Sequence, residues 1–406
     1  MKRVGPGSTA LAAVAAITLS CGEPAPGATA TARHPAASSD TRTVVDSRGA
    51  AVAVPRNPQR VVTISDCLIE EIMIVLGVED RLAGVGSACL IEEFRYEFEG
   101  TSQRFAYSGG KNPALLLNPE MADLPLFVRS GTEINFETLA GLEPDLLLID
   151  LGSCSLNWRN EPRAMPQGLE RLKGLGIPTL ILQGPNSGGS RNVESLSRVA
   201  RILGEVFGES DKAAELAETL EKSIEPVVER TKGVPDSSKP SVLLLGLNPN
   251  VRGGSGAIGL AYGARDIHSH IVDRLVNARN AYRRNTSAIL NLEQILSMNP
   301  DVLILPTSNG FHPPRELYDV SHFQTLDLLE AVRERRVAAL PWSPCNCDKR
   351  LEYPIDVMII ASAVYPDLFV DIELDEWILQ FFGSVYGVDR ATAMRMLQAL
   401  WLDWVL

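Results

Sequence analysis

The chain has 406 residues, a formal net charge of −12 and a hydrophobic content of 45%. This length exceeds the size at which one hydrophobic core usually keeps growing, so we expect two domains. The acidic balance argues against a nucleic-acid partner, and after residue 20 no apolar run is long enough to cross a bilayer.

The amino terminus has the pattern of an export signal. Two basic residues precede the almost wholly apolar residues 10–19, as in a cleaved signal peptide. Cys21 follows this segment and resembles the cysteine that is acylated in bacterial lipoproteins, although simple secretion and an inert, buried Cys21 are alternatives. Residues 22–41 are rich in Ala, Pro, Ser, Thr and Gly, so they cannot bury enough apolar surface to fold. We expect a tether there.

Strands and helices alternate along the first half of the remaining chain. Residues 43–54 are β-prone on either side of a turn-rich tetrapeptide, which predicts a hairpin. Further strands are predicted at residues 60–65, 82–85, 144–149 and 178–182, and helices at residues 68–77, 135–142 and 168–175. This alternation predicts a parallel sheet that is covered by helices on both faces.

A helical stretch without a strand follows at residues 192–232, which predicts one long connecting helix. The alternation then resumes, with strands predicted at residues 241–245, 301–305 and 337–340 and helices at residues 264–275, 292–298 and 354–364. Residues 397–406 predict an amphipathic helix that packs on the second half, with a membrane or partner contact as the alternative.

A short sequence motif occurs twice. Residues 135–139, followed by Glu-Pro-Asp-Leu at 143–146, return as residues 291–295, followed by Asn-Pro-Asp-Val at 299–302. One copy in each half predicts an α/β protein of two similar, Rossmann-like lobes with parallel sheets, joined by the long helix. The predicted boundaries are 1–20 for the signal peptide, 21–41 for the lipid-anchored tether, 42–190 for the first lobe, 191–239 for the helix and linker, and 240–406 for the second lobe with its tail.

These segments resemble the helix-hinged periplasmic binding proteins that deliver ferric siderophores, haem and cobalamin to ABC importers. The resemblance covers about residues 42–385 and rests on the strand at 60–65, the residues 82–86, the paired segments and residues 328–340. It implies a rigid helix between the lobes and a ligand cleft at the carboxyl ends of the strands, as open α/β sheets generally arrange.

The resemblance also implies partners. An ABC permease with its ATPase would receive the loaded protein through one glutamate at the start of each paired helix, Glu137 and Glu293. One negative charge on each lobe would align a two-lobed protein on a two-fold permease. Stabilisation of a helix N-terminus is the alternative role for both carboxylates. We expect a monomer on the extracytoplasmic or periplasmic face, in contact with the membrane only through the lipid anchor.

The cysteines carry the least usual chemistry. Those other than Cys21 each follow a predicted strand: Cys67, Cys89, Cys154, Cys345 and Cys347. Parallel strands would bring these thiols to the cleft, where several thiolates could bind a soft or borderline metal or an iron–sulfur cluster as the ligand. Exported proteins also oxidise their thiols, so disulfides, with Cys67–Cys89 as the preferred pair, and ordinary buried cysteines are the alternatives.

Other side chains could contact a ligand in the cleft. They are Arg252 in a glycine-rich loop, His312 in a proline-containing loop, Trp342 near the Cys-x-Cys segment, and Lys349 and Arg350, which could balance an anionic complex. Each has a plainer alternative, namely a flexible loop, packing or a solvated surface. His268 and His270 are two apart on a predicted helix, so they are not expected to chelate together.

We therefore expect a binding protein without catalytic activity that delivers a metal-containing ligand to a permease. The ligand would be an iron complex, a corrinoid, or a metal or iron–sulfur cluster bound by thiolates, and no other cofactor is expected. A rival hypothesis is a metal- or redox-handling lipoprotein whose cleft cysteines hold a permanent metal centre or turn over. The sequence offers no coherent set of nucleophile, base and acid.

Overall fold

The computed structural model describes residues 40–128, 134–156, 164–185, 187, 193–247, 256–307, 312–343 and 350–406. The chain divides into two units, residues 1–36 and 37–406, and all described residues lie in the second. Within the described ranges, no helix has both the length and the apolar character that a bilayer crossing requires.

The first half is built on a parallel sheet with the strand order β4-β3-β7-β8. The strands are β3 Val61–Ile64, β4 Leu82–Val85, β7 Leu146–Asp150 and β8 Thr179–Leu182. The helices between them are α1 Leu68–Leu76, α2 Ala88–Ile91, α3 Pro113–Leu117, α4 Phe136–Gly141 and α5 Ala164–Gly174. Every residue of β3 and β7 is buried, as expected for strands of a sheet covered on both faces. The predicted strands and helices of this half are confirmed, and so is the hairpin, β1 Thr41–Val45 with β2 Ala51–Pro55.

The second half contains a mixed sheet. Its main path is β12-β10-β9-β13-β14, and β11 also pairs with β9. The strands are β9 Ser241–Gly246, β10 Ala257–Ala261, β11 Arg279–Asn280, β12 Ala288–Asn291, β13 Val302–Leu305 and β14 Val337–Ala339. Strands β9, β13 and β14 are parallel as predicted, whereas β10 runs antiparallel to both β9 and β12. The sequence did not predict β10, because its Ala-Ile-Gly-Leu-Ala segment lacks the β-branched, alternating pattern of a strand.

The helices of this half include the three predicted ones and two short ones that were not predicted. They are α8 Ile267–His270, which continues as a π-helical turn, Ile271–Leu275, then α9 Leu292–Met298, α10 Pro314–Asp319, α11 Glu330–Arg333 and α12 Tyr353–Val364. Short 3-10 helices lie at Glu79–Arg81, Pro119–Asp123, Asp236–Ser238, Ser321–Leu328, Pro366–Leu368 and Asp403–Val405.

The connection between the halves is a pair of helices, α6 Val193–Phe207 and α7 Ser210–Thr231. The prediction of one helix over residues 192–232 is therefore wrong in its extent. Gly208 adopts φ 78°, which ends α6, and a Cβ on Gly204 would lie 2.4 Å from the Cβ of Ala213, so glycine lets the two helices pack closely. Helix α7 contacts α1 in the first half and α12 and α13 in the second, and it is the long helix that joins them.

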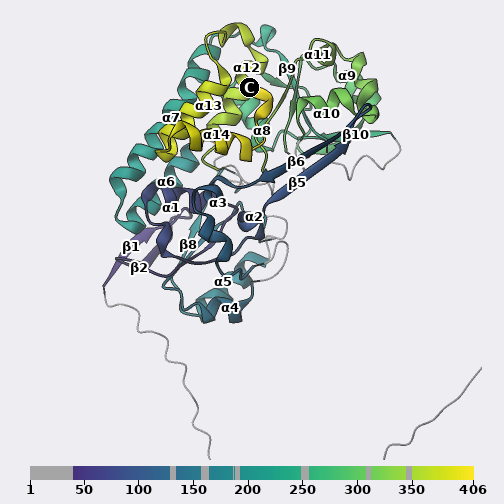
Figure 1. Ribbon diagram of the computed structural model, residues 1–406. Coiled ribbons are helices and arrows are strands. Elements are labelled where there is room, and N and C mark those ends of the chain that lie inside the picture. The colour runs from purple at the N-terminus through teal and green to yellow at the C-terminus, as the bar shows by residue number, and fades with distance from the viewer. Residues whose placement is uncertain are drawn as a thin grey trace, which may run out of the picture. The chain divides into compact units, whose positions relative to one another are not determined.

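A hairpin that the sequence did not predict extends from the first half along the second (Figure 1). It consists of β5 Phe94–Glu99 and β6 Arg104–Gly110, paired antiparallel. Its alternating residues Tyr96 and Phe98 are buried in the same hydrophobic cluster as residues of the second sheet. The hairpin therefore forms a second link between the two halves.

The carboxyl terminus also differs from the prediction. Helices α13 Leu374–Tyr386 and α14 Arg390–Ala399 precede a short turn, and Trp401 has φ 51°, so residues 397–406 do not form one helix. Trp401 Nε1 donates to the carbonyl oxygen of Ser108 at 3.0 Å. A Cβ on Gly110 would lie 2.7 Å from the Trp401 ring, so the terminal turn packs tightly against the hairpin.

Candidate functional site

Three strand-end loops of the first half meet at one carboxylate, Asp66, which lies just beyond β3 and is 2% exposed. Its Oδ1 accepts from Ser87 Oγ at 2.7 Å and from Ser155 Oγ at 2.9 Å, and its Oδ2 accepts from the backbone N–H of Cys154. Ser87 follows β4, and the other two residues follow β7. Asp66 was not identified from the sequence, because only the fold brings the three loops to its carboxylate.

Asp150, the last residue of β7, makes a similar link to the loop after β8. Its Oδ1 accepts from the backbone N–H of Gly152 at 3.0 Å and from Ser187 Oγ at 3.4 Å. The carboxyl ends of all four parallel strands thus carry loops that are joined through buried carboxylates, and this edge is where open α/β sheets bind ligands.

The described cysteines at this edge are in two chemical states. Cys67 is a buried free thiol, whereas Cys89 and Cys154 are disulfide-bonded. The preferred pairing of Cys67 with Cys89 is therefore wrong. Because a metal ligand must be a thiolate, the oxidised sulfurs of Cys89 and Cys154 are not available to a metal in this form. Cys345 and Cys347, like Cys21, lie outside the described residues.

Cys67 precedes helix α1 in a conformation unusual for a residue with a side chain, φ 125°. Ser65 Oγ accepts from the backbone N–H groups of Cys67, at 3.3 Å, and Ile69, at 3.2 Å, and so satisfies donors at the start of the helix. Cys67 Sγ donates to Glu71 Oε1 at 3.0 Å. Burial raises the pKa of this thiol well above its ordinary value, and Glu71 adds to the effect, so Cys67 stays protonated.

The Cys67–Glu71 contact is part of a charged cluster between the halves, which we call the ionic cluster: Cys67, Glu71, Arg350, Glu352 and Tyr386. Leu351 N–H donates to Glu71 Oε2 at 3.1 Å. Arg350 Nε lies 3.4 Å from Glu352 Oε2, and Tyr386 Oη donates to Glu352 Oε1 at 2.6 Å.

Arg350 also reaches the first half, where it donates to Asn112 Oδ1. Asn112 Nδ2 in turn donates to the carbonyl oxygen of Cys89 at 2.7 Å. Arg350 was a predicted cleft contact, but it is only 4% exposed and its partners are protein groups. Its position ties helix α1 and the loop after β4 to the second half.

The pKa values of Glu71 and Arg350 in the ionic cluster differ from their ordinary values. Burial, with repulsion from Glu352, raises the pKa of Glu71 to about 8. Burial alone would lower the pKa of Arg350, but Glu352 and Glu71 raise it above its ordinary value. At neutral pH the cluster therefore holds one compensated ion pair, Arg350 with Glu352, and a protonated Glu71.

A pH dependence of stability follows from Glu71. The folded protein keeps a proton that the unfolded chain releases above its ordinary pKa, so this contribution is fully present below about pH 4.5 and is lost as the pH rises through about 8. We expect the free energy of unfolding to fall between pH 5.5 and pH 8.5, and Glu71→Gln to reduce the fall by about 1.4 kcal/mol per pH unit. Urea denaturation at several pH values measures this slope.

Glu70 also contributes to the pH dependence of stability, because burial raises its pKa to about 7. The Glu71→Gln variant therefore keeps a residual slope of unfolding free energy against pH. The exposed Glu293→Gln is the control and is expected to keep the wild-type slope. Equal slopes for Glu71→Gln and wild type would contradict the assignment.

His312 and Trp342, two other predicted cleft contacts, hold the hairpin on the second half. His312 Nδ1 lies 2.9 Å from Glu316 Oε2, and Tyr96 Oη donates to Glu316 Oε1 at 2.8 Å. Trp342 is 2% exposed and packs between the rings of Phe94 and Trp401, with centroid distances of 5.2 and 5.0 Å. The remaining predicted contacts, Arg252 and Lys349, lie outside the described residues.

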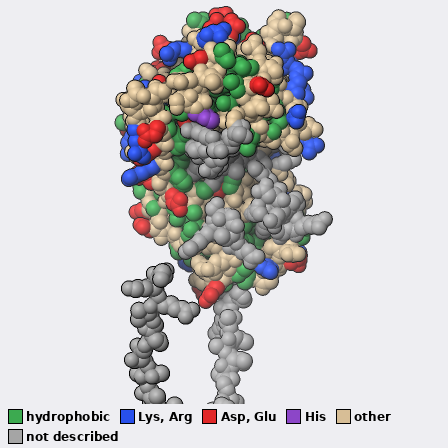
Figure 2. Space-filling model, turned by 90° about the vertical axis from the view of Figure 1, so that its right-hand side faces the viewer, with side chains coloured by type: hydrophobic (Ala, Val, Ile, Leu, Met, Phe, Trp, Pro, Cys, Tyr) green, Lys and Arg blue, Asp and Glu red, His purple; other side chains and the backbone are tan. Residues whose placement is uncertain are grey.

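Glu137 and Glu293 occupy equivalent places in the two halves. Each is the second residue of its helix, and each helix is capped by an asparagine side chain: Asn135 accepts from Thr138 N–H at 3.0 Å, and Asn291 accepts from Gln294 N–H at 2.9 Å. Both glutamates are exposed, and neither has an ion-pair partner in the described part of the chain. On the face drawn in Figure 2, acidic and basic side chains of described residues are interspersed.

Known proteins share this architecture. The sequence model of a family described as periplasmic binding protein matches residues 61–344. A periplasmic solute binding protein from Veillonella parvula is 19% identical, with a TM-score of 0.65 over 90% of this chain and 100% of that chain. No curated protein sequence matches the chain significantly.

Two further solved structures are similar at a comparable level. The molybdate-binding protein MolA of Haemophilus influenzae, bound to molybdate, is 17% identical, with a TM-score of 0.60 over 86% of this chain and 98% of that chain. CeuE of Helicobacter pylori, in a Ni-His complex, is 16% identical, with a TM-score of 0.56 over 87% of this chain and 98% of that chain. At these identities the structures establish the shared fold.

Proposed function

Because the chain belongs to the periplasmic binding protein family, we propose that it is the substrate-binding protein of an ABC importer. It captures a metal-containing small ligand between its two α/β halves and delivers it to the permease without catalysis. The observation that carries the proposal is the convergence of three strand-end loops on buried Asp66, at the sheet edge where such folds bind ligands.

The proposed ligand is a metal complex, such as an iron complex or a corrinoid. The molybdate and Ni-His complexes of the two similar proteins support this class. A metal or iron–sulfur cluster bound by thiolates has less support, since Cys89 and Cys154 are disulfide-bonded and Cys67 is a protonated, buried thiol. Among the described residues, no group of three or more His, Cys, Asp and Glu side chains is arranged to hold a metal ion.

The proposed location is the extracytoplasmic or periplasmic face of the membrane. Disulfides persist in oxidising compartments, so the state of Cys89 and Cys154 supports export. In this proposal Cys21 carries the lipid, residues 22–41 form the tether and the protein acts as a monomer. Docking on the permease uses Glu137 and Glu293. Both carboxylates are exposed and have no ion-pair partner among the described residues, and asparagine side chains already cap both helices.

Ligand titration tests the proposal. We expect at least one of Ni-His, molybdate, haemin and cobalamin to bind the purified protein with one-to-one stoichiometry, as measured by calorimetry. We expect Asp66→Asn to weaken that binding at least about tenfold, because the amide cannot accept from three loop donors as the carboxylate does. The exposed Asp80→Asn is the control and should bind like the wild type.

Three results would count against the proposal. One is that no metal complex binds. Another is that folded Asp66→Asn, checked by circular dichroism, binds as tightly as the wild type. The third is that protein purified anaerobically and without added ligand retains stoichiometric metal through dialysis, which would favour the rival lipoprotein with a permanent metal centre.

A further inference from the structure

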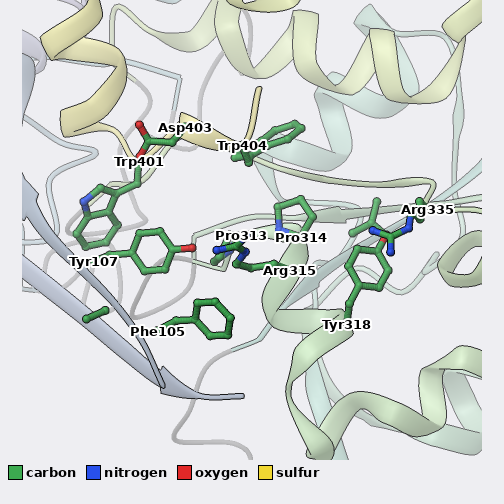
Figure 3. A pocket seen from close by; sticks show the side chains of 12 residues that line it. Phe105, Tyr107, Pro313, Pro314, Arg315, Tyr318, Arg335, Trp401, Asp403 and Trp404 are labelled. Carbon is green, nitrogen blue, oxygen red and sulfur yellow. The ribbon is translucent and has the colours of Figure 1, made fainter. Parts of the chain in front are cut away.

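A pocket of about 590 Å³ lies beside the hairpin (Figure 3). Its lining comes from strand β6, the start of α10, the residues around the start of β14 and the carboxyl-terminal turn. None of the described residues in the loops directly after β3, β4, β7 and β8 lines it. The pocket is therefore distinct from the sheet edge at Asp66, and its volume falls within the range of small-molecule sites, roughly 300–1,000 Å³.

The walls of this pocket are aromatic. Phe105 and Tyr107 come from the hairpin, and Trp401 and Trp404 come from the terminal turn. The Tyr107 and Trp401 rings are tilted against each other with centroids 5.8 Å apart. Such walls favour the flat face of a ring or conjugated system over a flexible aliphatic chain.

Two guanidinium groups supply the charge. Arg315 Cζ lies 4.9 Å from the centre of the Phe105 ring, and Arg335 Cζ lies 4.9 Å from the centre of the Tyr318 ring. Both arginines are exposed, and within the described ranges neither forms an ion pair with an acidic side chain. Stacking on a ring holds a guanidinium flat and leaves its N–H edge for an acceptor.

Other polar groups also line the pocket. Asp403 is the acidic lining residue, so the described lining carries two cationic side chains against one carboxyl group. Tyr318 Oη and Trp404 Nε1 are buried and have no hydrogen-bond partner among the residues that the structure describes. Buried donors of this kind are costly in a finished core, so a small rearrangement of these walls around an acceptor would be favourable.

We propose that this pocket is a second binding site, for a small planar aromatic carboxylate. The ring stacks on the aromatic walls, and the carboxylate accepts hydrogen bonds from a guanidinium. A cation is disfavoured by the two arginines, and a neutral ring offers their N–H groups no charged acceptor. This site goes beyond the proposed transport function and does not depend on it.

Titration with 2-naphthoate tests the proposal, because Trp401 and Trp404 provide a fluorescence signal in the walls. We expect saturable quenching with one site per chain. Arg315→Gln and Arg335→Gln should each weaken binding at least about tenfold, since each removes a charge-assisted donor. The neutral analogue 2-naphthalenemethanol should bind at least about tenfold more weakly than 2-naphthoate.

The matched control is Arg333→Gln, an exposed arginine close to Arg335 in the sequence that does not line the pocket. It should bind 2-naphthoate like the wild type. The proposal is overturned if quenching does not saturate at millimolar concentration, if both pocket variants bind normally, or if Asp66→Asn abolishes the signal while they do not. The last result would place the probe at the strand-end site, and the proposed transport function would survive it.

Discussion

Replacing Glu137 and Glu293 together by alanine is expected to abolish uptake of the ligand while the affinity of the protein for that ligand stays unchanged. Both carboxylates are exposed and lie on the first turn of α4 and of α9, outside the loops that directly follow β3, β4, β7 and β8. Close charge pairs across an interface contribute about 1.5 kcal/mol or more each, so losing two of them should lower uptake at least about a hundredfold. Uptake of radiolabelled ligand and calorimetry on the purified variant measure the two quantities.

Glu120 and Glu330 provide a matched control for that experiment. They are also exposed glutamates in the first turn of a helix, one in each half. The double alanine variant of Glu120 and Glu330 should transport normally, because we expect the loss of uptake to depend on the two docking positions and not on the lower negative charge. Normal uptake by the Glu137 and Glu293 double variant would remove the docking proposal and leave ligand capture untouched.

Arg350→Met is expected to lower the free energy of unfolding by about 3–5 kcal/mol, the usual cost of removing one partner from a buried ion pair. Arg350 and Glu352 are each 4% exposed, and the substitution leaves Glu352 without its counter-charge. Chemical denaturation measures the loss. Adding Glu352→Gln to Arg350→Met should recover part of it, because the uncompensated charge is then gone.

The control is Arg390→Met, on the solvent-exposed pair of Arg390 with Glu376, whose side chains are 63% and 32% exposed. An exposed pair contributes about 0–1 kcal/mol, so this variant should be nearly as stable as the wild type. If Arg350→Met costs no more than Arg390→Met, the ionic cluster does not hold the halves together.

Most of the fold could be predicted from hydrophobic periodicity. The buried strands β3, β7, β9 and β13 are continuous apolar runs, and Gly77 ends helix α1 with φ 73°, as its position after an apolar repeat indicated. The β5–β6 hairpin was missed although its signal is present, because Phe94–Glu99 alternates apolar and polar residues. Strand β10 carries no such signal, and its own residues do not indicate its antiparallel pairing with β9 and β12.

The candidate site was less accessible to sequence reasoning. The three described cysteines were placed correctly after their strands, since Cys67, Cys89 and Cys154 follow β3, β4 and β7. Their oxidation states depend on distances between loops, which spacing along the chain does not determine. The same holds for Asp66 and Arg350, whose roles arise from loops and halves that meet only in three dimensions.

The contact of Trp401 with Ser108 has a consequence for how the molecule is made. This hydrogen bond joins residues 293 positions apart, and it secures a hairpin that belongs by sequence to the first half. The hairpin therefore cannot reach its final packing until Trp401 is available. A shortened chain that lacks the terminal turn would leave aromatic surface of the hairpin exposed during folding, where it favours aggregation. The two halves are therefore expected to complete their packing together.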